Sequence, residues 1–102
     1  MLMILSKPPT VCDYTSILEI AKKAVEKGEK VAVLHVQDSC IATTLDEYCE
    51  ELAEARIDAY VLRADCEARG LLEKVGREVK IIGYREWVKL VMDKHSTIIS
   101  WT

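Results

Sequence analysis

The run Val-Ala-Val-Leu-His-Val at residues 31–36 limits the possible folds of this chain more than any other segment. A strand with a nearly continuous apolar sequence is covered on both faces, and such strands are typical of parallel sheets that carry helices on each side. Four shorter apolar runs have the same character: Leu2–Leu5, Ala59–Leu62, Val79–Ile82 and Thr97–Ser100. The sequence therefore predicts five strands in a layered α/β protein.

Amphipathic segments lie between these runs. The first has apolar residues at helical spacing, with Asp13 as its expected N-cap and Gly28 as its expected stop. The predicted helices are Tyr14–Lys27, Ile41–Ala55, Tyr84–Lys94 and a shorter helix over Asp65–Lys74 that Gly70 interrupts. Since strand and helix alternate, we expect a three-layer α/β/α fold with a mostly parallel five-stranded sheet. The length of 102 residues suits a single domain that spans residues 1–102.

Charge and composition argue against several classes of function. The formal net charge is −3, so the chain offers no overall basic field to phosphate backbones, and direct nucleic-acid binding is not expected. The apolar start, residues 1–5, is ended by Ser6, Lys7 and two prolines, which makes it too short for a signal peptide or a membrane span. We therefore expect a cytoplasmic protein with no membrane partner.

The cysteines, at positions 12, 40, 49 and 66, are widely spaced and form no C-x-x-C pair. His35 and His95 stand at no zinc-ligand spacing from them, so no metal site is predicted. The sequence also lacks the glycine-rich patterns that bind dinucleotides or nucleoside phosphates, and no cofactor is predicted. In a reducing compartment the default expectation is free thiols.

Cys40 and Cys66 follow the second and third predicted strands, at the sheet edge where open α/β folds collect their reactive groups. Ser39 and Asp65 precede them as expected N-caps, which places each thiol in the first turn of a helix. There the helix dipole and the unpaired N–H groups favour the thiolate, which is the form that carries sulfur. Both cysteines are therefore candidate catalytic residues.

Charges near these thiols act in both directions. Asp38 lies beside Cys40, and Asp65 lies beside Cys66; a neighbouring carboxylate raises the pKa of a thiol. Arg69 would offset this effect for Cys66. The alternative interpretation is that both cysteines pack as small apolar residues without any chemical role.

Five segments in order resemble the DsrH/TusB family of sulfur-relay subunits: MLMILSKPP, VLHVQDSCIAT, YVLRADCEARGL, IIGYREWVKLV and IISW. The resemblance covers essentially the whole chain. It departs from the family at Ser39, where a glycine usually follows the Gln-Asp pair, and at Cys40 and Cys66, where apolar residues are usual. Neither cysteine therefore inherits a catalytic role from this family. A sibling subunit, DsrE/TusD, carries sulfur on a cysteine after its third strand, but here the gap from Cys66 to Arg69-Gly70 is shorter by about one helical turn.

The resemblance implies a subunit of a cytoplasmic relay that passes persulfide sulfur toward 2-thiolation of tRNA wobble uridines or toward sulfur oxidation, acting mainly in assembly and docking. The implied partners are homologous DsrE/DsrF (TusD/TusC)-like subunits and a sulfur-donor carrier protein. Trp101 is the expected interface residue, because a terminal aromatic side chain gains burial from a neighbour. Packing of Trp101 within its own core is the alternative.

Two other functions fit the same sequence. One is a persulfide-carrying sulfurtransferase, at most an auxiliary enzyme, that uses Cys66 or Cys40 with Arg69 stabilising the thiolate. The other is a stand-alone homo-oligomeric module that binds a small anion at the strand ends.

Overall fold

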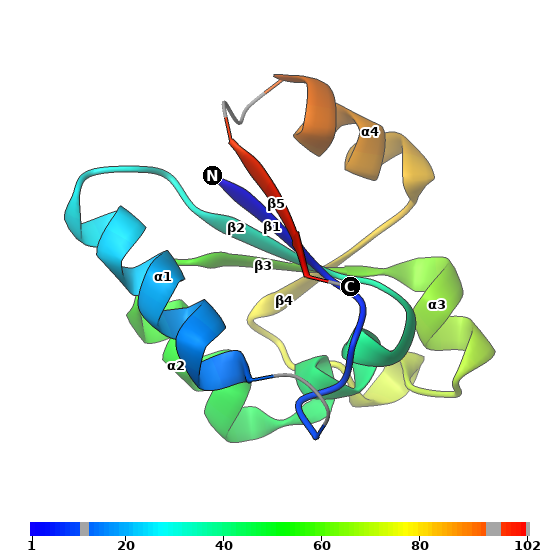
Figure 1. Ribbon diagram of the computed structural model, residues 1–102. Coiled ribbons are helices and arrows are strands. Elements are labelled where there is room, and N and C mark those ends of the chain that lie inside the picture. The colour runs from blue at the N-terminus through cyan, green and yellow to red at the C-terminus, as the bar shows by residue number, and fades with distance from the viewer. Residues whose placement is uncertain (11–12, 94–96, 102) are drawn as a thin grey trace.

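The computed structural model describes residues 1–10, 13–93 and 97–101, and Figure 1 shows their arrangement. The elements along the chain are β1 (Leu2–Leu5), α1 (Tyr14–Glu26), β2 (Ala32–His35), the 3₁₀-helix η1 (Gln37–Thr44), α2 (Asp46–Glu54), β3 (Asp58–Leu62), α3 (Arg63–Ala68), the 3₁₀-helix η2 (Leu72–Lys74), β4 (Val79–Ile82), α4 (Tyr84–Asp93) and β5 (Ile98–Trp101).

The strands form one five-stranded sheet in the order β4-β3-β2-β1-β5. From β1 to β4 each strand is added on the same side of the previous one, whereas the chain then crosses back to place β5 on the other side of β1. Right-handed crossovers in these two directions put α1 and α2 on one face of the sheet and α4 on the other (Figure 1). The predicted three-layer fold is confirmed, and all pairings between the described strands are parallel.

The alternation of side chains along the strands builds two apolar cores. Met3 and Val33 face α1 and α2 and are almost completely buried. Leu2 and Leu34 face the opposite way, where they pack in one cluster with Leu90 of α4. The buried members of this second cluster come from the strands, the residue after β2, and α4. The second face therefore depends on α4 for its cover.

α1 begins where the sequence predicts and ends one residue earlier. The Asp13 side chain accepts hydrogen bonds from the backbone N–H groups of Thr15 at 3.0 Å and Ser16 at 3.3 Å, as expected of an N-cap. Gly28 adopts a φ of 87°, a conformation that glycine takes without strain, and its N–H donates to the carbonyl of Val25 at 2.9 Å. Both sequence signals for this helix are confirmed.

The predicted helix over Ile41–Ala55 is wrong in its first part. That part belongs to η1, and α2 starts only after Leu45, whose φ of −94° and ψ of 113° are extended. The hydroxyl groups of Thr43 and Thr44 donate to the carbonyl groups three residues earlier, at 2.6 and 2.7 Å. These bonds favour the tight turns of a 3₁₀-helix over a continuous α-helix.

The remaining boundaries differ by a few residues. α3 follows β3 directly instead of starting at Asp65, and Gly70, with a φ of 66°, separates it from η2 as predicted. The predicted end of the last helix, Lys94, lies outside the described residues. β5 runs one residue further along the chain than the predicted Thr97–Ser100.

Candidate functional site

The carboxyl ends of β2 and β3 bring the two candidate thiols together. Cys40 lies in η1 and Cys66 in α3, and these two elements pack against each other. The two thiol groups lie near enough to each other that each one affects the pKa of the other. The sequence placed both cysteines at one edge of the sheet, but it gave no sign that they are in contact.

Burial determines the chemistry of this pair. Both cysteines are 0% exposed, and the Cys40 thiol also lies 3.8 Å from the carbonyl oxygen of His35, to which it donates. Desolvation raises the pKa of Cys40 to about 12, and it raises the pKa of Cys66 as well. Loss of water thus acts against the expected thiolate at both positions, and a chemical role for either cysteine stays a prediction.

The expected capping residues have other roles. No side chain caps η1 or α3. Ser39 is fully buried, and its hydroxyl lies 2.9 Å from the hydroxyl of Tyr14. Asp65 lies inside α3, where its carboxylate accepts a hydrogen bond from the backbone N–H of Gln37 at 2.7 Å. Gln37 has a φ of 50°, which is uncommon for a residue other than glycine, and Asp65 holds it there.

Arg69 links the same two elements from outside. Its Nε donates to the carboxylate of Asp38 at 3.1 Å, and its Nη1 donates to the backbone carbonyl of Asp65 at 3.1 Å. The positive charge of Arg69 opposes the rise in the pKa of both Cys40 and Cys66, but desolvation is the larger effect. Asp38, Asp65 and Arg69 thus join η1 to α3, whereas Ser39 contacts α1, and the support of a thiol by these residues stays a prediction.

A cavity of about 420 Å³ opens beside this ion pair, lined by Pro8, Thr10, Asp38, Ile41, Arg69 and Leu71. Neither Cys40 nor Cys66 lines it. Arg69 is the only cationic side chain among these lining residues, and it is already paired with Asp38. A small anion therefore finds no unpaired positive charge in the lining of this cavity.

His35 is a buried polar residue whose partners the sequence could not identify. It is 0% exposed; its Nδ1 lies 2.7 Å from the carbonyl oxygen of Tyr60, and its Nε2 lies 2.6 Å from the hydroxyl of Tyr48. Because a carbonyl only accepts, Nδ1 carries the proton and Nε2 accepts from Tyr48. Desolvation lowers the pKa of His35 to about 4, so the ring is neutral at physiological pH. The sequence marks His35 only as a polar residue inside an otherwise apolar strand, and this pattern does not identify its partners.

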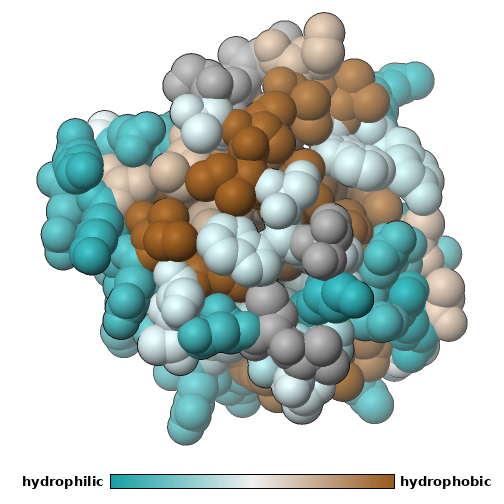
Figure 2. Space-filling view, viewed as in Figure 1, coloured by the Kyte–Doolittle hydropathy of each residue, from teal (hydrophilic) through white to brown (hydrophobic). Residues whose placement is uncertain are grey.

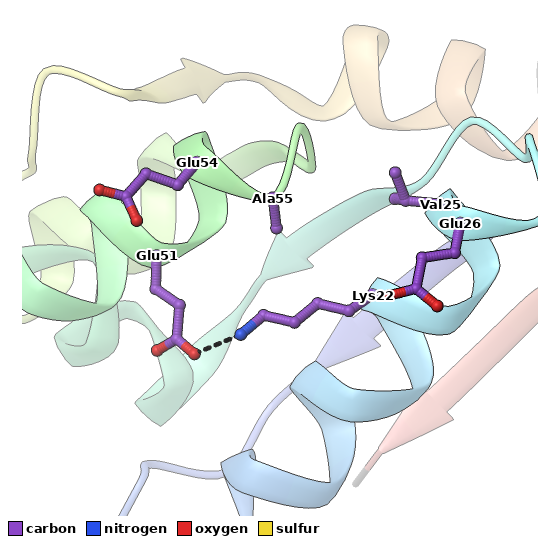
Figure 3. Close-up of a pocket in the computed structure, with 6 residues that line it drawn as sticks. All are labelled: Lys22, Val25, Glu26, Glu51, Glu54 and Ala55. Atoms are coloured by element: carbon purple, nitrogen blue, oxygen red, sulfur yellow. Dashed lines mark hydrogen bonds and ion pairs between the residues drawn. The ribbon is translucent and has the colours of Figure 1, made fainter.

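Figure 3 shows a second cavity, of about 320 Å³, between α1 and α2. Lys22 reaches across it, and its Nζ lies 2.7 Å from the Glu51 carboxylate. The two side chains are 41% and 44% exposed, and ion pairs exposed to this degree contribute little to stability. This cavity lies away from the carboxyl ends of the strands, and we assign no reaction to it.

Apolar side chains remain exposed along α4 and β5. Tyr84, Val88 and Met92 follow one another at four-residue spacing on α4 and are 57%, 58% and 76% exposed. Ile98, at the start of the edge strand β5, is 44% exposed. We call these four residues the α4–β5 surface. Figure 2 shows apolar side chains gathered over this part of the molecule.

Trp101, the predicted interface residue, is the last residue of β5. Its side chain is half-buried and packs against the core on the α1 and α2 side. Its backbone carbonyl accepts a hydrogen bond from the N–H of Ser6 at 3.1 Å. The side chain is thus partly covered by its own chain, and its contact with a partner stays a prediction.

A family model described as "DsrH like protein" matches residues 9–97. The chain belongs to the DsrH family. Two relatives of this DsrH chain, each called Protein TusB, come from Serratia proteamaculans and Pectobacterium atrosepticum. They are 34% and 32% identical to it over 102 residues, which cover 99% of this chain and 100% of each relative.

Solved structures share the fold of this DsrH chain at much lower identity. The ychN protein from E. coli superposes with a TM-score of 0.80 at 12% identity, covering 98% of this chain and 97% of that one. A conserved protein of unknown function from Bacteroides thetaiotaomicron gives a TM-score of 0.73 at 15% identity, with 98% and 93% covered. These two structures establish the fold alone.

Within residues 1–10, 13–93 and 97–101, no helix has the length and apolar character that a membrane crossing requires. In the same residues, no group of three or more His, Cys, Asp or Glu side chains is placed to hold a metal ion.

Proposed function

We propose that this chain is a non-catalytic subunit of a cytoplasmic sulfur-relay complex that passes persulfide sulfur toward 2-thiolation of tRNA wobble uridines. Membership of the DsrH family and the full-length similarity to proteins called TusB support this role. One observation carries the proposed division of labour: the strand-end thiols are fully buried, whereas the α4–β5 surface is exposed. A subunit of this kind assembles and docks, and a partner carries the sulfur.

The burial of Cys40 and Cys66 is the reason for assigning the sulfur to a partner. In thiol–persulfide exchange, an attacking thiolate must reach a sulfur atom of the donor. A donor protein has no access to side chains that are 0% exposed, and the raised pKa of both groups keeps them protonated. The acting thiol therefore belongs to a homologous DsrE/DsrF (TusD/TusC)-like subunit, which is loaded by a sulfur-donor carrier protein.

The α4–β5 surface is where we place the contact with a homologous subunit. Contiguous exposed apolar patches commonly mark interaction sites in soluble proteins. β5 is an edge strand with the sequence Ile-Ile-Ser-Trp, and it has neither the charged residues nor the proline that usually protect a sheet edge. A neighbouring subunit would bury both the α4–β5 surface and the exposed edge of β5.

A charge at Val88, between Tyr84 and Met92 on α4, is expected to weaken the contact with a homologous subunit. Val88→Glu should weaken binding of the homologous subunits by about 2 kcal/mol, or about 30-fold, because a carboxylate would be desolvated at the interface. The measurement is co-purification of the co-expressed subunits with the tagged chain, quantified by mass spectrometry.

The matched control is Ile20→Glu, which changes an apolar side chain of α1 that is 38% exposed. It lies on the opposite side of the sheet from α4, and we expect normal recovery of the partners. Recovery of partners with Val88→Glu at the wild-type level would contradict the placement of the interface. Loss of partners with Ile20→Glu would move the interface to α1.

Cys40 and Cys66 of the folded chain are expected to take up no sulfur from a persulfide-loaded donor. Peptide mapping by mass should show no gain of about 32 Da, the mass of one sulfur atom, on either residue of the wild type, or on Cys40 of Cys66→Ser. The same protein unfolded in urea exposes its thiols and serves as the positive control. A sulfur adduct on the folded wild type that disappears in Cys66→Ser would favour the persulfide-carrier function instead.

A further inference from the structure

Cys40 and Cys66 form a pair that the proposed docking role does not use. Both are 0% exposed and belong to one core cluster. They come from different elements, η1 and α3, which pack against each other, and each thiol affects the pKa of the other. Two neighbouring nucleophilic side chains that a protein substrate cannot reach can react with each other once a small oxidant arrives.

We propose that Cys40 and Cys66 are a modification site: a buried dithiol that a hydroperoxide converts into an intramolecular disulfide linking η1 to α3. Two contacts already fix these elements beside each other. Gln37 donates its backbone N–H to Asp65 at 2.7 Å, and Arg69 pairs with Asp38 at 3.1 Å. A disulfide bond, about 2 Å long, would add a covalent link between elements that these contacts already hold together.

The two thiols are not equivalent, and Cys66 is the one that attacks the oxidant. The interaction with Cys40 and the charge of Arg69 both lower the pKa of Cys66 against the larger effect of desolvation. For Cys40, the interaction with Cys66 adds to desolvation, and the pKa is about 12. The thiolate is the nucleophile in this chemistry, so the thiol that ionises more easily reacts first.

The reaction has two balanced steps. Cys66 is protonated in most molecules, so the attack starts from the small fraction in which it has lost its proton. That thiolate attacks one oxygen of hydrogen peroxide, the O–O bond breaks, and the hydroxide that leaves takes up the lost proton, giving water and a sulfenic acid. The Cys40 sulfur then attacks the Cys66 sulfur, and the sulfenic oxygen leaves as water with the Cys40 proton. Overall, two thiols and one peroxide give one disulfide and two waters.

The consequence of the bond lies in the adjacent cavity. Asp38 and Ile41 of its lining belong to η1, whereas Arg69 and Leu71 follow α3. In the reduced protein the exposed Asp38–Arg69 pair helps to hold these two walls together, and such pairs are weak. A disulfide beneath the pair fixes the walls covalently. Because both thiols are buried, peroxide reaches them through local opening, and oxidation is slower than for an exposed thiol.

The test is to treat the folded full-length chain with hydrogen peroxide, to alkylate the remaining thiols in denaturant, and to map the peptides by mass. We expect a loss of about two hydrogen masses and one linked peptide pair that contains Cys40 and Cys66. Cys49→Ser is the matched control, because Cys49 is also buried but donates to the carbonyl of Thr43 at 3.3 Å, and this variant should still form the bond.

The variants test the order of the two steps. Cys40→Ser should stop at a sulfenic acid on Cys66, trapped by a 1,3-diketone probe, whereas Cys66→Ser should give neither the probe adduct nor the disulfide. An adduct on Cys40 in the second variant would overturn the assigned order. Absence of the linked pair in the oxidised wild type, or a mixture of pairs that includes Cys49, would overturn the site. The wild-type map needs no variant, and it is independent of partner binding.

Discussion

Lowering the pH from about 7 to about 4 is expected to reduce the free energy of unfolding by about 3 kcal/mol through His35 alone. The pKa of His35 is about 4 in the folded protein because the ring is fully buried, compared with an ordinary value of 6.5. Between about pH 6.5 and 4, His35 binds a proton in the unfolded chain but stays neutral in the folded chain. The loss therefore grows as the pH falls from 6.5 toward 4, and it levels off below that, where both states are protonated. Urea unfolding at a series of pH values measures it.

His35→Asn is the variant that isolates this effect. Its amide can still donate toward the carbonyl of Tyr60, but it does not titrate, and it leaves Tyr48 without its acceptor. We expect this variant to be less stable than the wild type at neutral pH and to depend less steeply on pH between about 6.5 and 4. Asp13, whose pKa is lowered by its hydrogen bonds with Ser16, loses stabilising contacts in acid in both proteins, so the difference between them reports on His35. Equal slopes for the two proteins would contradict the assignment.

The position of His35 connects this acid sensitivity to the strand-end site. The ring of Tyr48, which donates to His35, contacts the ring of Tyr14 in a tilted arrangement with 5.4 Å between the ring centres. Tyr14 in turn donates to the carbonyl of Lys7 at 2.7 Å, so the hydroxyl of Ser39 donates to Tyr14. The network thus runs from β2 through α2 and α1 to the first residues of η1. Protonation of His35 would disturb the hydrogen bonds that hold Ser39 of η1 in place. We therefore expect acid to loosen η1, at the carboxyl end of β2, before the rest of the sheet.

The strands could be predicted because each one carries its own signal. Residues 31–36 are apolar at almost every position, and a strand covered on both faces needs no information from elsewhere in the chain. α1 was predictable for the same reason, since Asp13 and Gly28 mark its ends locally. The break between η1 and α2 could not be predicted, because the amphipathic spacing of the apolar residues continues across it. The threonine hydroxyls that hold the 3₁₀ turns leave that spacing unchanged.

The candidate site was predictable in place but not in chemistry. The carboxyl ends of parallel strands lie at the same edge of a sheet, and this was enough to place Cys40 and Cys66 at that edge, whereas the pairing of β2 with β3 was not predicted. Their pKa values depend instead on how α3 packs over η1, which removes water from both thiols. That packing rests on contacts between residues far apart in the sequence, such as Gln37 with Asp65. A charge pattern read along the chain contains no information about such desolvation.

Truncation of Leu90 to alanine is expected to lower the free energy of unfolding by about 2–4 kcal/mol. Leu90 is 7% exposed and packs with Leu2 and Leu34, so its removal leaves a cavity under the helix that covers this face of the sheet. Met92→Ala is the matched control two residues away. It is 76% exposed, and its truncation should change stability by no more than about 0.5 kcal/mol. Thermal and urea unfolding measure both variants.

The same pair of variants separates the stability of α4 from its role in docking. Leu90→Ala should weaken binding of homologous subunits only as far as it loosens the helix, so lowering the temperature or adding a stabilising osmolyte should restore binding. Met92→Ala should weaken binding at every temperature without any loss of stability, because it removes apolar area from the α4–β5 surface itself. If Met92→Ala bound partners as the wild type does while Leu90→Ala failed to bind even when stabilised, the contact would involve the covered side of α4, and the exposed stripe would have no part in it.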